Sequence, residues 1–122
     1  MAYLRDIRKN ILANKSFDFS IRIVDLYKFL VKKKEYVLSK QILRSGTAIG
    51  ALITEAQNAE SKKDFIHKLG ISQKECSETI YWLNVLQKGI YINKEQFQSL
   101  LKDTEELLKM LRSSILTAKK NL

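Results

Sequence analysis

Four charged side chains could act together, because each lies among apolar residues at helical spacing. Arg44 and Glu55 belong to one predicted helix, and Glu75 and Glu78 belong to the next. A semi-buried charge needs a partner, and a guanidinium can hold a carboxylate through two hydrogen bonds. In an antiparallel hairpin that turns near Ala59, Arg44 comes closer to Glu75 or Glu78 than Glu55 does. We therefore expect an ionic network that fixes helix register or lies between subunits, with a direct ligand site as the alternative.

The remaining reactive side chains do not form a catalytic pattern. His67 has no acidic residue three or four positions after it, and the Glu-x-x-His pairing of di-iron bundles is missing. Cys76 lies on an apolar stripe between Ser72 and Thr79, as a small core residue would. The chain has neither a glycine-rich phosphate loop nor a metal-ligand cluster. These observations predict no enzymatic activity, no metal and no cofactor.

Composition indicates an all-α protein. The 122 residues include no proline and only four glycines, with 45% hydrophobic and 29% charged residues. This mixture suits long amphipathic helices and leaves few turns for strands. A single cysteine, no secretory signal and no apolar run of membrane-spanning length predict a reduced, cytoplasmic setting without membrane association.

Apolar periodicity predicts one domain, residues 1–122, with an up-down-up-down four-helix bundle and a short N-terminal helical extension over residues 3–13. The expected helices cover residues 17–34, 38–59, 62–88 and 94–119. Ser16 is the expected N-cap of the first helix, Ser61 with Asp64 starts the third, and Asn93 with Gln96 caps the fourth. Gly89 is expected to end the third helix in a left-handed conformation.

The stripes along the helices indicate how they pack. The third predicted helix has the most regular stripe: Phe65, Leu69, Ser72, Cys76, Thr79, Leu83, Leu86 and Ile90. On the second helix, Ala48 and Ala51 lie between Arg44 and Glu55 and imply a neighbouring helix at close range. Gly46 and Gly50 lower helix propensity by about 1 kcal/mol each. We expect a close contact or a kink there, with a subunit contact as one alternative.

The segment from Leu38 to Leu83 resembles a known bacterial family. Its pattern QxxRSxxxIxxxxxEAxxxxSxxDF, followed by Glu78, is similar to the signature of four-helix-bundle proteins of ribosomal RNA intervening sequences. The accessory protein of diversity-generating retroelements is related to them. The resemblance implies a homopentameric, barrel-like ring and, in some members, nucleic-acid binding through a basic surface, without catalysis. Ala48 and Leu52 depart from the pattern, which usually has serine and asparagine there.

A net charge of +9 and a pI of about 9.7 favour anionic partners, with nucleic acid first and an acidic membrane surface second. The predicted topology gathers one set of cations at one end of the bundle: Arg5, Arg8, Lys9, Lys15, Lys62, Lys63, Lys119 and Lys120. The opposite end collects another: Lys32, Lys33, Lys34, Lys40, Lys88 and Lys94. Few aromatic residues interleave with these lysines, so base stacking is not expected.

Two functions remain open from the sequence. The first is a homo-oligomeric, sequence-non-specific nucleic-acid-binding accessory protein, with RNA or DNA and a nucleic-acid-processing enzyme as partners. The second is an oligomeric protein–protein scaffold whose positive charge is incidental. In the second case, the lysines are only solvated helix termini.

Overall fold

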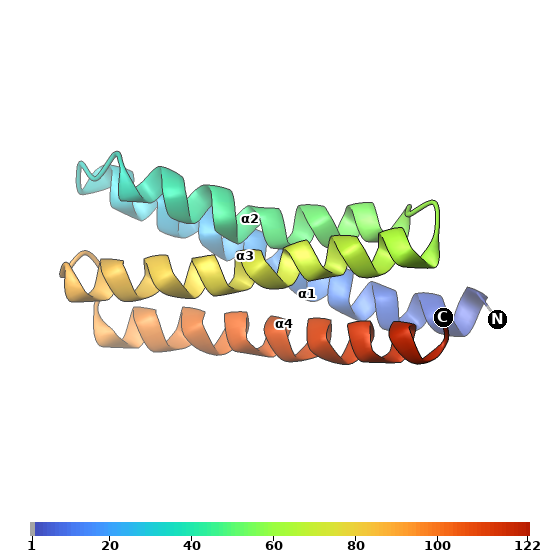
Figure 1. Ribbon diagram of the computed structural model, residues 1–122. Helices are drawn as coiled ribbons and strands as arrows, with labels where there is room; N and C mark the ends of the chain where they lie inside the picture. Colours follow the sequence, from blue (N-terminus) through green and yellow to red (C-terminus); the bar gives the residue numbers. More distant parts are fainter. Residues whose placement is uncertain (1) are drawn as a thin grey trace.

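The fold is a four-helix bundle. A computed structural model describes the backbone of residues 2–122 and the side chains of residues 11–122. Its helices are α1 (Ala2–Lys32), α2 (Leu38–Gln57), α3 (Lys62–Lys88) and α4 (Lys94–Lys120). They run up-down-up-down, so the start of α1, the α2–α3 turn and the end of α4 share one end of the bundle (Figure 1). We call this the terminal end. The opposite end, with the α1–α2 and α3–α4 turns, is the double-turn end.

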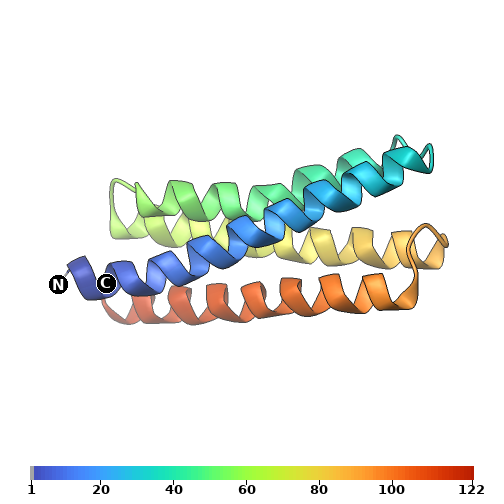
Figure 2. The ribbon, with the colours of Figure 1, turned by 180° about the vertical axis from the view of Figure 1, so that it is seen from behind.

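Helix α1 leans against α2 more than against α4. It contacts α2 along much of its length and α4 over a shorter stretch. In Figure 2, α1 starts beside the end of α4 and crosses to lie beside α2 at the double-turn end. The bundle therefore has three extensive helix interfaces and one narrow one.

The expected break at Ser16 is wrong. Helix α1 runs without interruption from Ala2 to Lys32, so the N-terminal extension is part of it. The Ser16 hydroxyl is buried and donates to the Ala13 carbonyl, 2.9 Å away, inside the helix. Serine can make this bond to the preceding turn as readily as it can cap a helix. Neither glycine nor proline interrupts this stretch, and buried Leu12 and Phe19 continue the apolar stripe on both sides.

The left-handed cap is at Ile90 rather than at Gly89. Gly89 has φ −78°, whereas Ile90 has φ 66°. The Ile90 amide donates to the Gln87 carbonyl at 3.0 Å, and the Tyr91 amide donates to the Leu86 carbonyl at 2.9 Å. This is the Schellman arrangement, in which glycine usually takes the left-handed position. Ile90 is 86% exposed, so it also does not extend the buried stripe of α3 as expected.

The α1–α2 turn repeats this geometry. Lys34 has φ 64°, its amide donates to Val31, and the Glu35 amide donates to Leu30. The buried Glu35 carboxylate then accepts the backbone amides of Val37 and Ser39 at 3.1 and 2.6 Å. It satisfies two of the free amides at the start of α2, where Val37 itself provides no side-chain cap. Sequence analysis missed this role of Glu35.

Glycines bring α2 close to α1. A Cβ atom on Gly46 would lie 2.7 Å from the Cγ1 atom of buried Ile23. A Cβ atom on Gly50 would lie 3.2 Å from the Ser16 carbonyl oxygen. These glycines therefore serve a close contact within the chain. The close approach expected at Ala51 is wrong, because Ala51 is exposed on the bundle surface.

The core follows the predicted stripe of α3. Its buried residues are Leu69, Ser72, Cys76, Thr79, Leu83 and Leu86. The central polar members are satisfied: the Ser72 hydroxyl donates to the Ile49 carbonyl at 2.9 Å, and the Thr79 hydroxyl donates to Ser45 at 3.0 Å. Both expected caps are present, since Ser61 accepts the Asp64 amide and Asn93 forms a capping box with Gln96. None of the described helices is long and apolar enough to cross a membrane.

Candidate nucleic-acid interface

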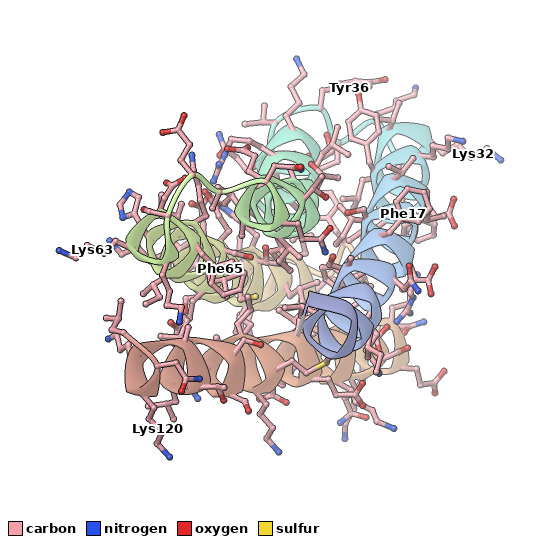
Figure 3. The ribbon with its side chains drawn as sticks, turned by 90° about the vertical axis from the view of Figure 1, so that its right-hand side faces the viewer. Phe17, Lys32, Tyr36, Lys63, Phe65 and Lys120 are labelled. Atoms are coloured by element: carbon pink, nitrogen blue, oxygen red, sulfur yellow. The ribbon has the colours of Figure 1, made fainter. Side chains whose placement is uncertain are left out.

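The terminal end carries exposed lysines from two helices. Figure 3 looks along the bundle from this end and shows Lys63 and Lys120 extending outward in different directions. Lys119 is also exposed, whereas the Lys62 ammonium donates to the Asn121 carbonyl at 2.7 Å. The predicted cations Arg5, Arg8 and Lys9 lie outside the residues whose side chains are described. The lysines of the terminal end are thus spread around the rim of the bundle.

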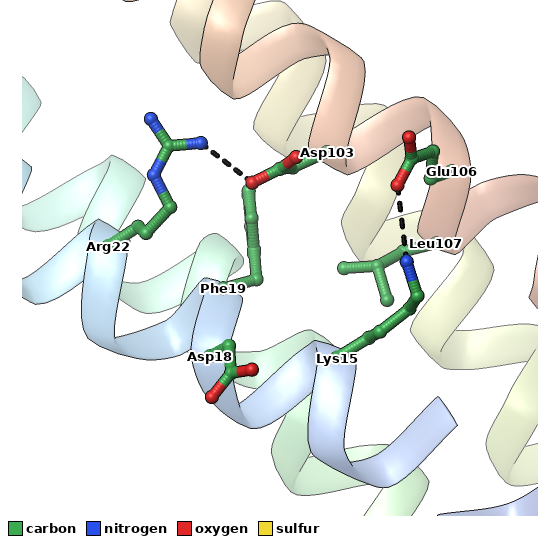
Figure 4. A pocket seen from close by; sticks show the side chains of 7 residues that line it. All are labelled: Lys15, Asp18, Phe19, Arg22, Asp103, Glu106 and Leu107. Carbon is green, nitrogen blue, oxygen red and sulfur yellow. Dashed lines mark hydrogen bonds and ion pairs between the residues drawn. The ribbon is translucent and has the colours of Figure 1, made fainter. Parts of the chain in front are cut away.

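Lys15 does not join that group. It lines a groove of about 200 Å³ between α1 and α4, and its ammonium lies 3.4 Å from Glu106 (Figure 4). Two turns further along α1, Arg22 pairs with Asp103 at 2.6 Å and donates to the Ser99 hydroxyl at 2.9 Å. Because the charges pair across the groove, it offers little net field to an anion.

The double-turn end holds the second predicted set of lysines, all of them exposed. Lys33 joins the two turns, because its ammonium donates to the Tyr91 carbonyl at 3.3 Å and lies 4.6 Å from the centre of the Phe29 ring. Three large apolar side chains are exposed at the same end: Tyr36, Val37 and Ile90. Sequence analysis placed the lysines there but missed the apolar residues beside them.

The expected pairing of Arg44 with α3 is present. Its guanidinium donates to both carboxylate oxygens of Glu75, at 3.2 and 3.0 Å, and lies 2.7 Å from Glu78. Glu55 lies apart from this cluster and pairs with Lys68 at 3.1 Å. The side chains of Arg44 and Glu55 are 51% and 54% exposed, so the expectation that they are semi-buried is wrong. Only the side chain of Glu75, at 17%, is largely covered.

This cluster shifts protonation toward its charged forms. Hydrogen bonds to Glu75, and secondly to Glu78, raise the pKa of Arg44. The Trp82 indole donates to Glu78 at 2.9 Å, and this bond, followed by the one from Arg44, lowers the pKa of Glu78. The hydrogen bond to Glu55 raises the pKa of Lys68. The Arg44 cluster is therefore internally paired at neutral pH.

The two remaining reactive residues carry no catalytic geometry. Cys76 is fully buried, and burial raises the pKa of its thiol to about 12, which keeps it protonated and unreactive. His67 is exposed on α3. Within the described part of the chain, no three His, Cys, Asp or Glu residues are grouped as metal ligands would be.

The fold is a four-helix bundle with four ion-paired cations on its sides and clusters of exposed lysines at its ends. Residues 8–113 match the model of the 23S rRNA-intervening sequence protein family, and the chain belongs to this family. Among solved structures, it is similar to a protein of unknown function from the S23 ribosomal protein family of Bacteroides thetaiotaomicron. The two are 53% identical with a TM-score of 0.87, over 88% of this chain and 97% of the other. No curated protein gives a significant match.

Proposed function

We propose that this chain is a non-catalytic, homo-oligomeric accessory protein that binds RNA or DNA through phosphates, without reading sequence. The distribution of its charges supports the proposal. Four cations on the sides of the bundle pair with carboxylates: Lys15 with Glu106, Arg22 with Asp103, Arg44 with Glu75 and Lys68 with Glu55. Other cations on the sides are exposed singly along the helices: Lys28, Lys74, Lys102, Lys109 and Arg112. The lysines at the ends are exposed and clustered, and among the described residues none of them forms an ion pair, although Lys33 and Lys62 donate to backbone carbonyls. Unpaired lysines can release the counterions of a nucleic acid, which is the main source of non-specific affinity.

The dependence of affinity on salt tests this proposal. A labelled oligonucleotide and a scrambled sequence of the same length are titrated by fluorescence anisotropy across a salt series. We expect equal affinities for the two sequences and a steep loss of affinity with salt, with a slope of about −0.9 per neutralised phosphate on duplex DNA. Absence of binding at low salt, or binding insensitive to salt, contradicts the proposal.

Exposed apolar residues on α1 support the homo-oligomeric part of the proposal. The family resemblance leads us to expect a pentamer. Phe17 and Ile21 lie one turn apart on the outer side of α1 and are 65% and 47% exposed. Figure 3 shows Phe17 on the side of α1 that faces away from the other helices. Exposed apolar neighbours of this kind are typical of protein contacts. Light scattering should give an oligomer, and Phe17→Lys with Ile21→Lys should dissociate it.

Leu116→Lys is the matched control, because Leu116 is 61% exposed on α4. A wild-type monomer at high concentration rules out the oligomer. The same exposed residues favour the second candidate function, a protein–protein scaffold. A partner such as a nucleic-acid-processing enzyme that binds equally well at high salt, together with no affinity for oligonucleotides, supports the scaffold instead.

A further inference from the structure

The two ends of the bundle differ in their balance of charge. At the double-turn end, six exposed lysines face a single exposed carboxylate, Glu95, because the Glu35 carboxylate is buried against the start of α2. Among the described side chains of the terminal end, four lysines lie beside two acidic residues, Glu60 and Asp64, while Glu55 is paired with Lys68. Among the described side chains, the positive charge is therefore less offset by carboxylates at the double-turn end.

The double-turn end also exposes apolar side chains among its lysines. Tyr36 is 54% exposed, Val37 is 70% exposed and Ile90 is 86% exposed. Tyr36 and Val37 belong to the α1–α2 turn, and Ile90 belongs to the α3–α4 turn. The two turns are in contact, because the Lys33 ammonium donates to the Tyr91 carbonyl. Lysines interspersed with an aromatic ring are the composition of surfaces that hold unpaired bases.

Ile90 is in a conformation that costs stability. Its φ of 66° is left-handed, which is unfavourable for a β-branched residue, and its side chain packs against little of the bundle. Glycine at this position would remove the strain without opening a cavity. The isoleucine side chain thus has no evident use within the chain, and a strained, exposed residue of this kind is a reason to look for a binding role.

We infer that the double-turn end binds single-stranded nucleic acid, with its lysines on the phosphates and with Tyr36 and Ile90 against unpaired bases. This inference rests on the proposed function. A duplex would present phosphates to the lysines but would keep its base faces stacked. A single strand offers both, so it matches the mixture of charge and apolar surface at this end.

Two matched triple variants test the location. One carries Lys32→Ala, Lys34→Ala and Lys94→Ala at the double-turn end. The other carries Lys63→Ala, Lys119→Ala and Lys120→Ala at the terminal end. All six lysines are exposed, and among the described residues none of the six ammonium groups has an ion pair. Loss of three phosphate contacts should reduce the salt slope on an oligo(dT) strand by about 2, only in the first variant.

Substitutions at the apolar residues test the contact with bases. Tyr36→Ala should weaken oligo(dT) binding at least about fivefold, with little change on a duplex of equal length. Ile90→Gly should also weaken binding to the single strand while raising the melting temperature of the free protein. Weaker binding by a more stable protein cannot come from misfolding.

The outcomes separate this inference from the proposed function. If the wild type binds neither strand nor duplex, the proposed function fails. If binding survives the double-turn triple variant and is lost in the terminal one, only the location is wrong. If Tyr36→Ala affects strand and duplex equally, the base contacts are wrong. If Ile90→Gly instead abolishes binding to anionic phosphatidylserine vesicles and leaves oligo(dT) binding unchanged, the exposed residues contact a membrane surface.

Discussion

Helix α1 is held by two interfaces that work differently. Against α2, its spacing is set by shape, because Gly46 leaves room for the buried Ile23 side chain and Gly50 leaves room for the Ser16 backbone. Against α4, the contact is narrower, encloses a groove and is bridged by the exposed pairs of Arg22 with Asp103 and Lys15 with Glu106. Close packing tolerates added volume poorly, whereas exposed ion pairs contribute little. We therefore expect the stability of the bundle to depend far more on the α1–α2 interface.

The largest expected effect is at Gly46. Gly46→Val would place carbon atoms within the space of the fully buried Ile23 side chain, three of whose carbons would already lie within 3.0 Å of a Cβ atom on Gly46. We expect a loss of about 3 kcal/mol in the free energy of unfolding, measured by urea denaturation. Adding Ile23→Ala should recover part of that loss, because it empties the space that valine needs.

Gly70→Ala is the matched control. A Cβ atom on Gly70 would meet nothing within 4 Å, so only helix propensity should change, and stability should rise by about 1 kcal/mol. A loss at Gly46 that Ile23→Ala does not relieve would show that α1 and α2 are not held by shape. Destabilisation by Gly70→Ala would indicate that another chain covers this part of α3.

Regular features of the bundle could be predicted from the sequence. The buried stripe from Leu69 to Leu86 follows from heptad spacing, and the pairing of Arg44 with α3 follows from the register of a short hairpin. The caps at Ser61 and Asn93 follow from local side-chain chemistry. Each of these depends on residues close in sequence or on a single turn.

Other features could not be predicted, because the residues involved can adopt either of two local conformations that the sequence alone does not distinguish. Ser16 can cap a helix or bond within one, and the burial of its neighbours decided the outcome. Glu35 caps α2 only because the preceding turn directs its carboxylate inward. Ile90 takes the left-handed position although glycine precedes it, because the hydrogen bonds of the turn fix which residue must have that conformation. Because these turns leave Tyr36, Val37 and Ile90 exposed, the apolar surface of the double-turn end could not be predicted either.

The α1–α4 interface should respond weakly to loss of its charges. Arg22 and Asp103 are 39% and 38% exposed, so the double variant Arg22→Ala with Asp103→Ala should lose about 0.5 kcal/mol. A double-mutant cycle at low and high salt measures the coupling, which should shrink as salt is added. A coupling that is larger and independent of salt would show that this interface is closed as firmly as the α1–α2 interface.

The smallest expected effect on stability concerns Glu78, which belongs to the Arg44 cluster between α2 and α3. The hydrogen bond from Trp82, and then that from Arg44, lowers its pKa below the ordinary 4.5, so the folded state favours the charged carboxylate. This contribution is present above pH 4.5 and is lost as pH falls through the lowered value. Trp82→Phe should therefore raise the pKa of Glu78, measured by carboxyl NMR titration, and should flatten the acid loss of stability. In a Glu78→Gln background, Trp82→Phe should change stability equally at every pH. If that change still varies with pH, the indole acts through another carboxylate, such as Glu75.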